Sequence, residues 1–253
     1  MQSSADLGAS GLIGSVHSTI TGGAVDGPGL RFVLFMSGCL MRCLYCHNPD
    51  TWNIANGTPR TVDNILSEVG KVSLFLKAAG GITISGGEPL VQADFVHEVF
   101  ARCKAEYGLH TALDTNGLLA RNLPDEWFDV VDLVLLDIKQ IDPDKHRRLT
   151  SAPLEPVLDF AQRLARMGKP TWVRYVLVPG LTDDVDDVER LADYVATLKN
   201  VERVEILPFH KMGEYKWKEI GVPYELGDML PPAPELVDRV RKQFEARGLL
   251  AVA

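Results

Sequence analysis

The feature that most constrains the fold is an alternation of two hydrophobic periods after residue 30. Amphipathic helical stripes lie at residues 95–103, 157–165, 188–198 and 236–244, and Gly108 and Gly168 stand where the first two helices should end. Alternating strands and helices predict right-handed βαβ units and a parallel sheet. Short, continuous apolar runs, typical of strands buried on both faces of such a sheet, lie at Leu30–Met36, Gly81–Ser85, Leu109–Asp114, Asp132–Ile138, Thr171–Pro179 and Val201–Pro208.

Six strands are too few for a closed eight-stranded barrel. The count predicts an α/β fold with a partial (β/α)6 TIM-like barrel, and an open doubly wound sheet is the alternative that periodicity does not separate from it. The residues before Leu30, including GLIGSVHSTI, are expected to add a strand or hairpin at the edge. With 253 residues, 46% of them hydrophobic, we expect one domain over residues 1–253, with a core of about 30–250 and an N-terminal extension of 1–29.

Charge and hydropathy limit the partners. The formal net charge is −8, with 26 basic against 34 acidic residues, which argues against a general nucleic-acid binder. The start, MQSSADLGAS, lacks the basic and apolar regions of a signal peptide. No run approaches the roughly 18 apolar residues of a membrane span. We therefore expect a cytoplasmic protein with no membrane and no nucleic-acid partner.

A polar or cysteine-rich cluster follows the C-terminal end of each predicted strand. The clusters are, in chain order, the cysteine loop, GGEP, DTNG, DIK, VPG and LPFH. In parallel α/β barrels the βα loops converge at that end of the strands and build the active site there. The sequence therefore predicts one site made from six separate segments.

The first cluster, GCLMRCLYCHN, spaces Cys39, Cys43 and Cys46 as C-x3-C-x2-C. Thiolates are the usual ligands of iron–sulfur clusters, and a cubane has four irons. The remaining cysteine, Cys103, lies on an apolar helix stripe and reads as core, so one iron would be open to a substrate. The alternatives are inert buried thiols or structural zinc, which takes four protein ligands; His47, adjoining Cys46, is poorly placed to be the fourth.

The cysteine spacing, with an aromatic residue before the last cysteine, resembles the signature of the radical S-adenosylmethionine superfamily. More narrowly, VDGPGLRFVLFMSGCLMRCLYCHNPDTW resembles the activating enzymes of glycyl radical enzymes. The similarity continues through ISGGEPLVQADF, LDTNG, DLVLLDIKQ, WVRYVLVPGLTDD and EILPFHKMGEYKW. It implies a 4Fe–4S cluster that reductively cleaves S-adenosylmethionine to a 5′-deoxyadenosyl radical, which takes a hydrogen atom from a backbone glycine of a partner enzyme.

The same resemblance implies a pocket for S-adenosylmethionine. Its GGEP segment would receive the methionine amino group, because glycines admit close backbone approach and a carboxylate complements an ammonium. The tyrosine and histidine beside the last cysteine would contact the adenosyl part, and a later histidine the adenine. The residues implied in this pocket are Tyr45, Cys46, His47, Gly86, Gly87, Glu88, Asp137, Ile138, Lys139 and His210, with Arg174 and Val176 as weaker candidates.

Two further sites follow from the resemblance. Asp114, Thr115 and Asp137, with the backbone carbonyl of Leu135, match positions that hold a monovalent cation, Na⁺ or K⁺, and oxygen ligands suit a hard cation. Asp26 and His47 would act in catalysis by facing the incoming protein substrate. Asp26 could equally be a turn residue that hydrogen-bonds its own backbone.

The implied partners are a protein substrate and a reductant. Some relatives carry an inserted ferredoxin-like module, for which this chain has no cysteines beyond Cys103, and this favours the branch that acts on pyruvate formate-lyase. A flavodoxin-like or ferredoxin-like carrier would reduce the cluster, and the chain is expected to be a monomer. The rival interpretations are a radical enzyme acting on a small molecule, for which the DGPG segment is not required, and an iron–sulfur carrier or zinc-binding module.

Overall fold

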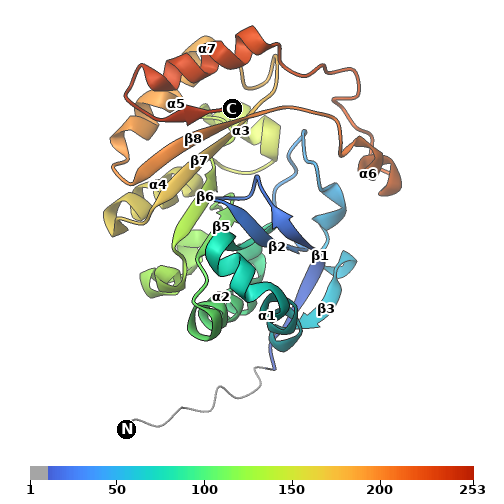
Figure 1. Cartoon of the computed structure of the whole chain (residues 1–253). Coiled ribbons are helices and arrows are strands. Elements are labelled where there is room, and N and C mark those ends of the chain that lie inside the picture. Colours follow the sequence, from blue (N-terminus) through green and yellow to red (C-terminus); the bar gives the residue numbers. More distant parts are fainter. Residues whose placement is uncertain (1–10) are drawn as a thin grey trace.

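The computed structural model describes residues 11–253 (Figure 1). Residues 1–10, on which the signal-peptide prediction rests, lie outside the described part. The strands form one sheet in the order β3-β1-β2-β4-β5-β6-β7-β8-β9. Their bounds are β1 Ile13–Gly23, β2 Leu30–Met36, β3 Thr58–Thr61, β4 Gly80–Gly86, β5 Thr111–Thr115, β6 Leu133–Asp137, β7 Thr171–Leu177, β8 Val201–Pro208 and β9 Ala251–Val252.

The strand order decides between the two predicted architectures. From β2 through β4 to β8 the pairing is parallel, and the spatial order follows the chain order. A doubly wound sheet would reverse its order at a switch point. The sheet instead winds in one direction and ends at β3 and β9 without those edges pairing. The six predicted strands thus form the expected partial barrel.

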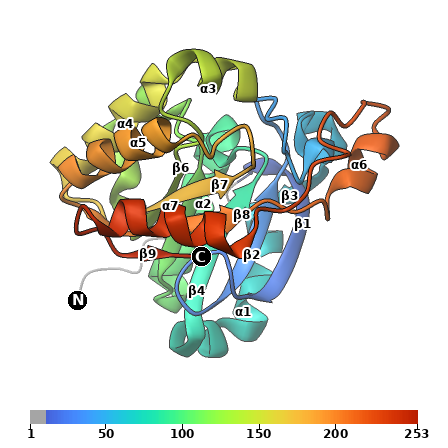
Figure 2. The same ribbon diagram turned by 90° about the horizontal axis from the view of Figure 1, so that it is seen from above.

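The helices lie around the outside of the curved sheet (Figure 2). Four of them, α2, α4, α5 and α7, confirm the predicted stripes, and both glycine stops are confirmed, with Gly108 and Gly168 in the left-handed region at φ 61° and 63°. The prediction lacked α1, although its buried residues follow the same period. The bounds are α1 Val62–Ala79, α2 Ala93–Tyr107, α3 Pro143–Thr150, α4 Glu155–Met167, α5 Val185–Thr197, α6 Glu214–Glu219 and α7 Pro234–Glu245.

The expected edge extension is confirmed as β1, which pairs antiparallel with β2. Two short strands were not predicted. β3 pairs antiparallel with β1, and β9, only two residues long, pairs parallel with β8. Strands this short carry too few residues to show a period. Among residues 11–253, no helix has the length and apolar character needed to cross a membrane.

Several of the expected site residues lie on the inner face of the barrel. A small apolar cluster of Ala112, Leu133, Leu135 and Trp172 fills its interior, separate from the large core beneath the helices. Side chains two residues apart on a strand share a face. Two positions after Ala112, Leu135 and Trp172 the strands therefore carry inward-facing polar residues at their C-terminal ends: Asp114, Asp137 and Arg174.

Candidate active site

A cavity of about 270 Å³ opens at the C-terminal end of the parallel strands. Residues from every segment named in the sequence except VPG line it, so the prediction of one converging site holds for five of the six. Of the expected site residues, the cavity wall contains Asp26, Cys39, Cys43, Tyr45, Cys46, His47, Gly86, Gly87, Asp114, Thr115, Asp137, Lys139, Arg174 and Val176. Glu88, Ile138 and His210 do not line it.

The cysteine loop is held by backbone hydrogen bonds to α3. The amide of Arg42 donates to the carbonyl of Thr150 at 2.7 Å, and that of Leu44 donates to Leu149 at 3.0 Å. These carbonyls belong to the last turn of α3, which has no intrahelical donors left for them. The loop therefore satisfies the end of the helix, and the helix in turn sets the path of the chain between the cysteines.

The three cysteine thiols of this loop are suited to bind an iron–sulfur cluster in which each thiolate binds a different iron. Burial raises the pKa of Cys39 and Cys43 to about 12 and that of Cys46 to about 11, so the thiols need a cationic partner to ionise. Within residues 11–253, no three His, Cys, Asp or Glu side chains converge on a point that could hold a single metal ion. A cubane distributes its ligands over separate irons, so three cysteines that line one cavity without converging on a single point fit it.

The two glycines of GGEP are required because the backbone packs closely against neighbouring segments. Gly86 has φ +114°, and a Cβ there would lie 2.3 Å from the amide nitrogen of Met36. A Cβ on Gly87 would lie 2.5 Å from the carbonyl oxygen of Gly38, at the start of the cysteine loop. The segment thus presses against β2 and the cysteine loop, and this same contact brings its backbone to the cavity.

Glu88 differs from its expected place. Only 1% of it is exposed, and its carboxylate accepts hydrogen bonds from the amides of Leu90 at 3.0 Å and Asn116 at 2.9 Å and from the hydroxyl of Thr115 at 2.6 Å. Burial raises its pKa to about 7 in spite of these three donors. Glu88 therefore joins the GGEP segment to the DTNG loop, and an ammonium in the cavity would not contact it.

Asp114 on β5 and Arg174 on β7 form a buried ion pair that spans the intervening strand β6. Nη1 of Arg174 lies 2.9 Å from Oδ2 of Asp114, which also accepts from the Ser85 hydroxyl at 2.7 Å. Nε of the same arginine lies 3.4 Å from Glu205 on β8. Burial raises the pKa of Asp114, and the arginine opposes that rise. Arg174, a weaker candidate from the sequence, is thus the side chain that connects β5, β7 and β8 beside the cavity.

Lys139 and Asp137 form a second pair, with Nζ to Oδ2 at 2.9 Å. Burial opposes the lysine charge, but Asp137 and the nearby Tyr45 outweigh it and raise the pKa of Lys139. Ile138, between the two, is fully buried in the core because neighbouring strand residues face opposite sides. Its expected contact with a ligand could only be through its backbone.

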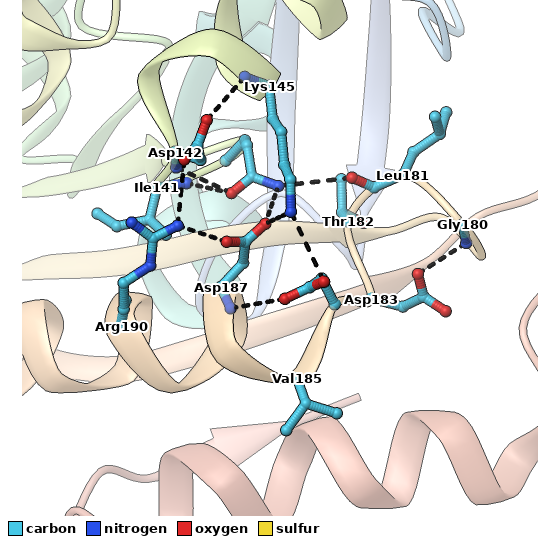
Figure 3. A network of polar contacts seen from close by, with 12 residues as sticks. Ile141, Asp142, Lys145, Gly180, Leu181, Thr182, Asp183, Val185, Asp187 and Arg190 are labelled. Atoms are coloured by element: carbon cyan, nitrogen blue, oxygen red, sulfur yellow. Dashed lines mark hydrogen bonds and ion pairs between the residues drawn. The ribbon is translucent and has the colours of Figure 1, made fainter.

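The chain after Lys139 is anchored by the polar network of Figure 3. At its centre lies Asp187 on α5, only 2% exposed. The carboxylate of Asp187 accepts from Gln140 at 3.2 Å, from Lys145 at 2.6 Å and from Arg190 at 2.5 Å. Three donors and two cations satisfy this buried charge, so the end of β6 is tied to α3 and α5 just behind the cavity.

The side chains proposed to bind a monovalent cation are already engaged by protein groups, but Oδ1 of Asp114 is buried and has no hydrogen-bond partner among residues 11–253. Asp114 is bound by Arg174 and Asp137 by Lys139, while the Thr115 hydroxyl donates to Glu88. An ion at this place would have to compete with two cationic side chains.

His47 and His210 stack with ring centroids 4.1 Å apart, and His47 Nε2 lies 2.9 Å from the carbonyl oxygen of His210. Burial, then the neighbouring His210, lowers the pKa of His47. His210 therefore stands behind His47 instead of on the cavity wall. The segment after it continues into α6, where the indole N–H of Trp217 donates to the carbonyl of Cys46 at 2.9 Å.

The cavity also contains residues that the sequence reasoning did not single out. All of them belong to the quoted motifs, and this membership was the only sign in the sequence that they lie at the site. Spacing along the chain does not show in which direction their side chains point. Asn116 of DTNG has its amide nitrogen 3.9 Å from the sulfur of Cys39. The others are Phe35, Met41, Asn48, Trp52, Ser85 and Leu207.

Comparison with known proteins gives the family. Residues 33–195 match the Radical SAM superfamily. A solved radical SAM methyltransferase from Sphaerobacter thermophilus shares the fold at 18% identity, with a TM-score of 0.65 over 88% of this chain and 65% of that one. A solved domain of a pyruvate-formate lyase-activating enzyme from Bacteroides vulgatus is 27% identical, with a TM-score of 0.57 over 69% of this chain and 98% of that one.

Two relatives are similar along nearly their whole length. The pyruvate formate-lyase-activating enzyme of Streptococcus mutans is 50% identical over 237 residues, covering 90% of each chain. That of Staphylococcus epidermidis is 45% identical over 249 residues, covering 95% of this chain and 99% of its own. With both the superfamily match and these relatives, the chain belongs to the radical SAM superfamily and, within it, to the family of pyruvate formate-lyase-activating enzymes.

Proposed function

We propose that this chain activates pyruvate formate-lyase by installing a glycyl radical on its backbone. One observation carries the proposal: the three cysteines of the C-x3-C-x2-C loop line the same cavity as the strand-end residues of GGEP, DTNG and DIK. The chain is an enzyme of the radical SAM superfamily, whose members use a 4Fe–4S cluster and S-adenosylmethionine.

Cys39, Cys43 and Cys46 would hold the cluster, and three protein ligands would leave one of its four irons for the cosubstrate. When bound, the cluster supplies one electron for cleavage of S-adenosylmethionine, and the resulting 5′-deoxyadenosyl radical takes one hydrogen atom from a backbone glycine. The buried thiols ionise only against a cationic centre, which accords with a metal cluster as their partner.

The protein's own part is to bind and orient the cosubstrate. Lys139 and Arg174 place two cations on the cavity wall, where a methionine carboxylate would find partners. Because Glu88 is engaged elsewhere, we assign the ammonium to the backbone of Gly86 and Gly87. His47, fixed by the stacked His210, offers a flat surface for the adenosyl part.

Asp26 and His47 line the same cavity as the three cysteines and are proposed to face the glycine of the protein substrate. Alanine variants at these two positions are expected to fail in activating the partner. Asp26→Ala should still cleave S-adenosylmethionine at the normal rate, whereas His47→Ala should cleave it with a weakened contact to the adenosyl part. Normal activation by both variants would remove them from that role.

A monovalent cation, Na⁺ or K⁺, is proposed at Asp114, Thr115 and Asp137, with the carbonyl of Leu135. Oδ1 of Asp114 has no hydrogen-bond partner in the described part of the chain and is available to such an ion, which would share the two carboxylates with Arg174 and Lys139. Affinity for S-adenosylmethionine measured in Na⁺, K⁺ and a bulky organic cation tests this. Equal affinity in all three would exclude the site.

The reductant is proposed to be a low-potential flavodoxin-like or ferredoxin-like carrier, and the chain is proposed to act as a monomer. All four cysteines are unpaired, which suits a reducing compartment such as the cytoplasm.

The deciding experiment is anaerobic reconstitution followed by addition of reductant, S-adenosylmethionine and pyruvate formate-lyase. The proposal requires a glycyl radical signal by electron paramagnetic resonance and one 5′-deoxyadenosine per radical. Cleavage of S-adenosylmethionine without a protein radical would instead favour a small-molecule substrate.

A further inference from the structure

Asp26 lies in the turn between β1 and β2, which is wound tightly against the neighbouring strand. Gly27 and Gly29 have φ of +118° and +74°. A Cβ on Gly29 would lie 1.9 Å from the carbonyl oxygen of Ala79, at the end of α1. Within residues 11–253, the carboxylate of Asp26 forms no hydrogen bond or ion pair. The position of this carboxylate in the cavity therefore depends on how the backbone of its turn is held.

Arg31 lies beneath that turn and is completely buried. Its Nη1 donates to the carbonyl oxygens of Pro28 and Gly80, both at 3.1 Å. Its Nη2 donates to the carbonyl oxygen of Ile82 at 2.6 Å and to that of His110 at 3.2 Å. Burying a guanidinium among neutral acceptors is costly, and these bonds tie the turn to β4 and to the start of β5.

The remaining donor of this arginine, Nε, reaches the hydroxyl oxygen of Thr83 at 2.5 Å. A guanidinium has donors only, so Thr83 must accept from Arg31. Its own proton is then directed to the carbonyl oxygen of Asp26, which lies 2.6 Å away. The arginine thus fixes the orientation of the hydroxyl, and the hydroxyl fixes the peptide of Asp26.

The other side of Asp26 is held independently. Nη2 of Arg174 donates to the carbonyl of Val25 at 3.1 Å. Two successive peptides of the turn are therefore bound from two different strands, β4 and β7, both of which end at the cavity. Both anchored peptides adjoin Asp26, a half-buried residue that lines the cavity.

We propose that Arg31 and Thr83 are a positioning pair that holds Asp26 at the cavity and so determines how efficiently the radical is passed to the partner's glycine. The inference rests on the role proposed above for Asp26. Thr83 and Arg31 do not line the cavity, so cleavage of S-adenosylmethionine should not depend on them. Transfer of the radical to the partner's glycine should depend on them, because small displacements of an orienting group lower the rate of a reaction that needs close alignment.

The test is the Thr83→Val variant, which keeps the side-chain shape and removes the hydroxyl. Reconstituted holoenzyme is assayed for 5′-deoxyadenosine formed and for glycyl radical formed on pyruvate formate-lyase. We expect the ratio of radical to 5′-deoxyadenosine to fall about tenfold, the size of effect that one lost buried hydrogen bond can have on a rate. Thr83→Ser, which restores the hydroxyl, should restore the ratio.

Thr111→Val is the matched control. Thr111 is equally buried on the neighbouring strand β5, and its hydroxyl donates to the carbonyl of Val130, away from the turn. It should lose stability without changing the ratio. Iron content and affinity for S-adenosylmethionine, measured for each variant, show that the cluster and cosubstrate still bind.

The outcomes separate the two levels of the proposal. A normal ratio in Thr83→Val overturns the positioning pair, whatever Asp26→Ala does. A lowered ratio in Thr83→Val with normal activation by Asp26→Ala supports anchoring of the turn and rejects the role of the Asp26 carboxylate. Equal losses in Thr83→Val and Thr111→Val would show a general stability effect and also overturn the pair.

Discussion

The buried carboxylate of Glu88 predicts a pH dependence of stability that a single substitution should remove. Its pKa in the folded protein is about 7, against an ordinary value of 4.5, because burial outweighs three hydrogen bonds. Between these two values the native chain binds more protons than the unfolded chain, so stability falls as pH rises. From about pH 5.5 to about pH 8, Glu88 should lower the unfolding free energy by about 2 kcal/mol.

Glu88→Gln cannot ionise, so it carries no such dependence. Its amide nitrogen cannot accept a hydrogen bond, which leaves the N–H of Asn116 unsatisfied at a cost of about 1–3 kcal/mol. We therefore expect the variant to be less stable than the wild type by about that amount near pH 5.5. This difference in unfolding free energy between wild type and variant should shrink by about 2 kcal/mol near pH 8, where the wild-type carboxylate is charged.

The measurement is urea-induced unfolding of the cluster-free chain under anaerobic conditions, followed by circular dichroism at both pH values. Glu126→Gln, at an exposed position, controls for changes in net charge. A difference in unfolding free energy that stays constant with pH would refute the raised pKa of Glu88. A difference that widens with pH would mean that the three hydrogen bonds outweigh burial.

Four other substitutions test the assignments of the site. Cys103→Ala should retain reconstituted iron and lower the unfolding free energy by about 1 kcal/mol, whereas Cys39→Ala should lose iron, as iron analysis would show. Trp217→Phe removes the donor to the carbonyl of Cys46 and should make α6 more open to limited proteolysis, at a cost of about 1 kcal/mol; unchanged digestion would contradict the contact. Arg174→Lys loses the planar fork and should weaken binding of S-adenosylmethionine about tenfold by calorimetry, and unchanged affinity would remove it from the pocket.

The sequence could predict the barrel because its signals are local. A buried strand and an amphipathic helix each show their period within one segment, and consecutive βαβ units have one handedness. The same reasoning missed β9, which is too short for a period, and α1, whose period was present. It also left open whether the sheet reverses, because strand order depends on which segments pair.

The placement of the motifs at strand ends likewise followed from sequence, since parallel strands present their C-terminal ends together. Glu88 shows the limit of this inference. Its position in GGEP put it near the site, but its carboxylate is taken by Thr115 and Asn116, 27 and 28 residues away. His210 was placed correctly after β8, yet it stacks on His47 and stands behind it.

The sequence by itself determined the strand and helix order, the three-cysteine loop and the segments that meet at one rim, because each depends on spacing along the chain. The tertiary structure alone decided which polar groups pair between strands: Asp114 with Arg174, and Thr83 with Arg31 and the peptide of Asp26. Those pairs join strands distant in sequence, and a buried polar group takes whichever partner packing brings within hydrogen-bond reach. No local pattern encodes that choice.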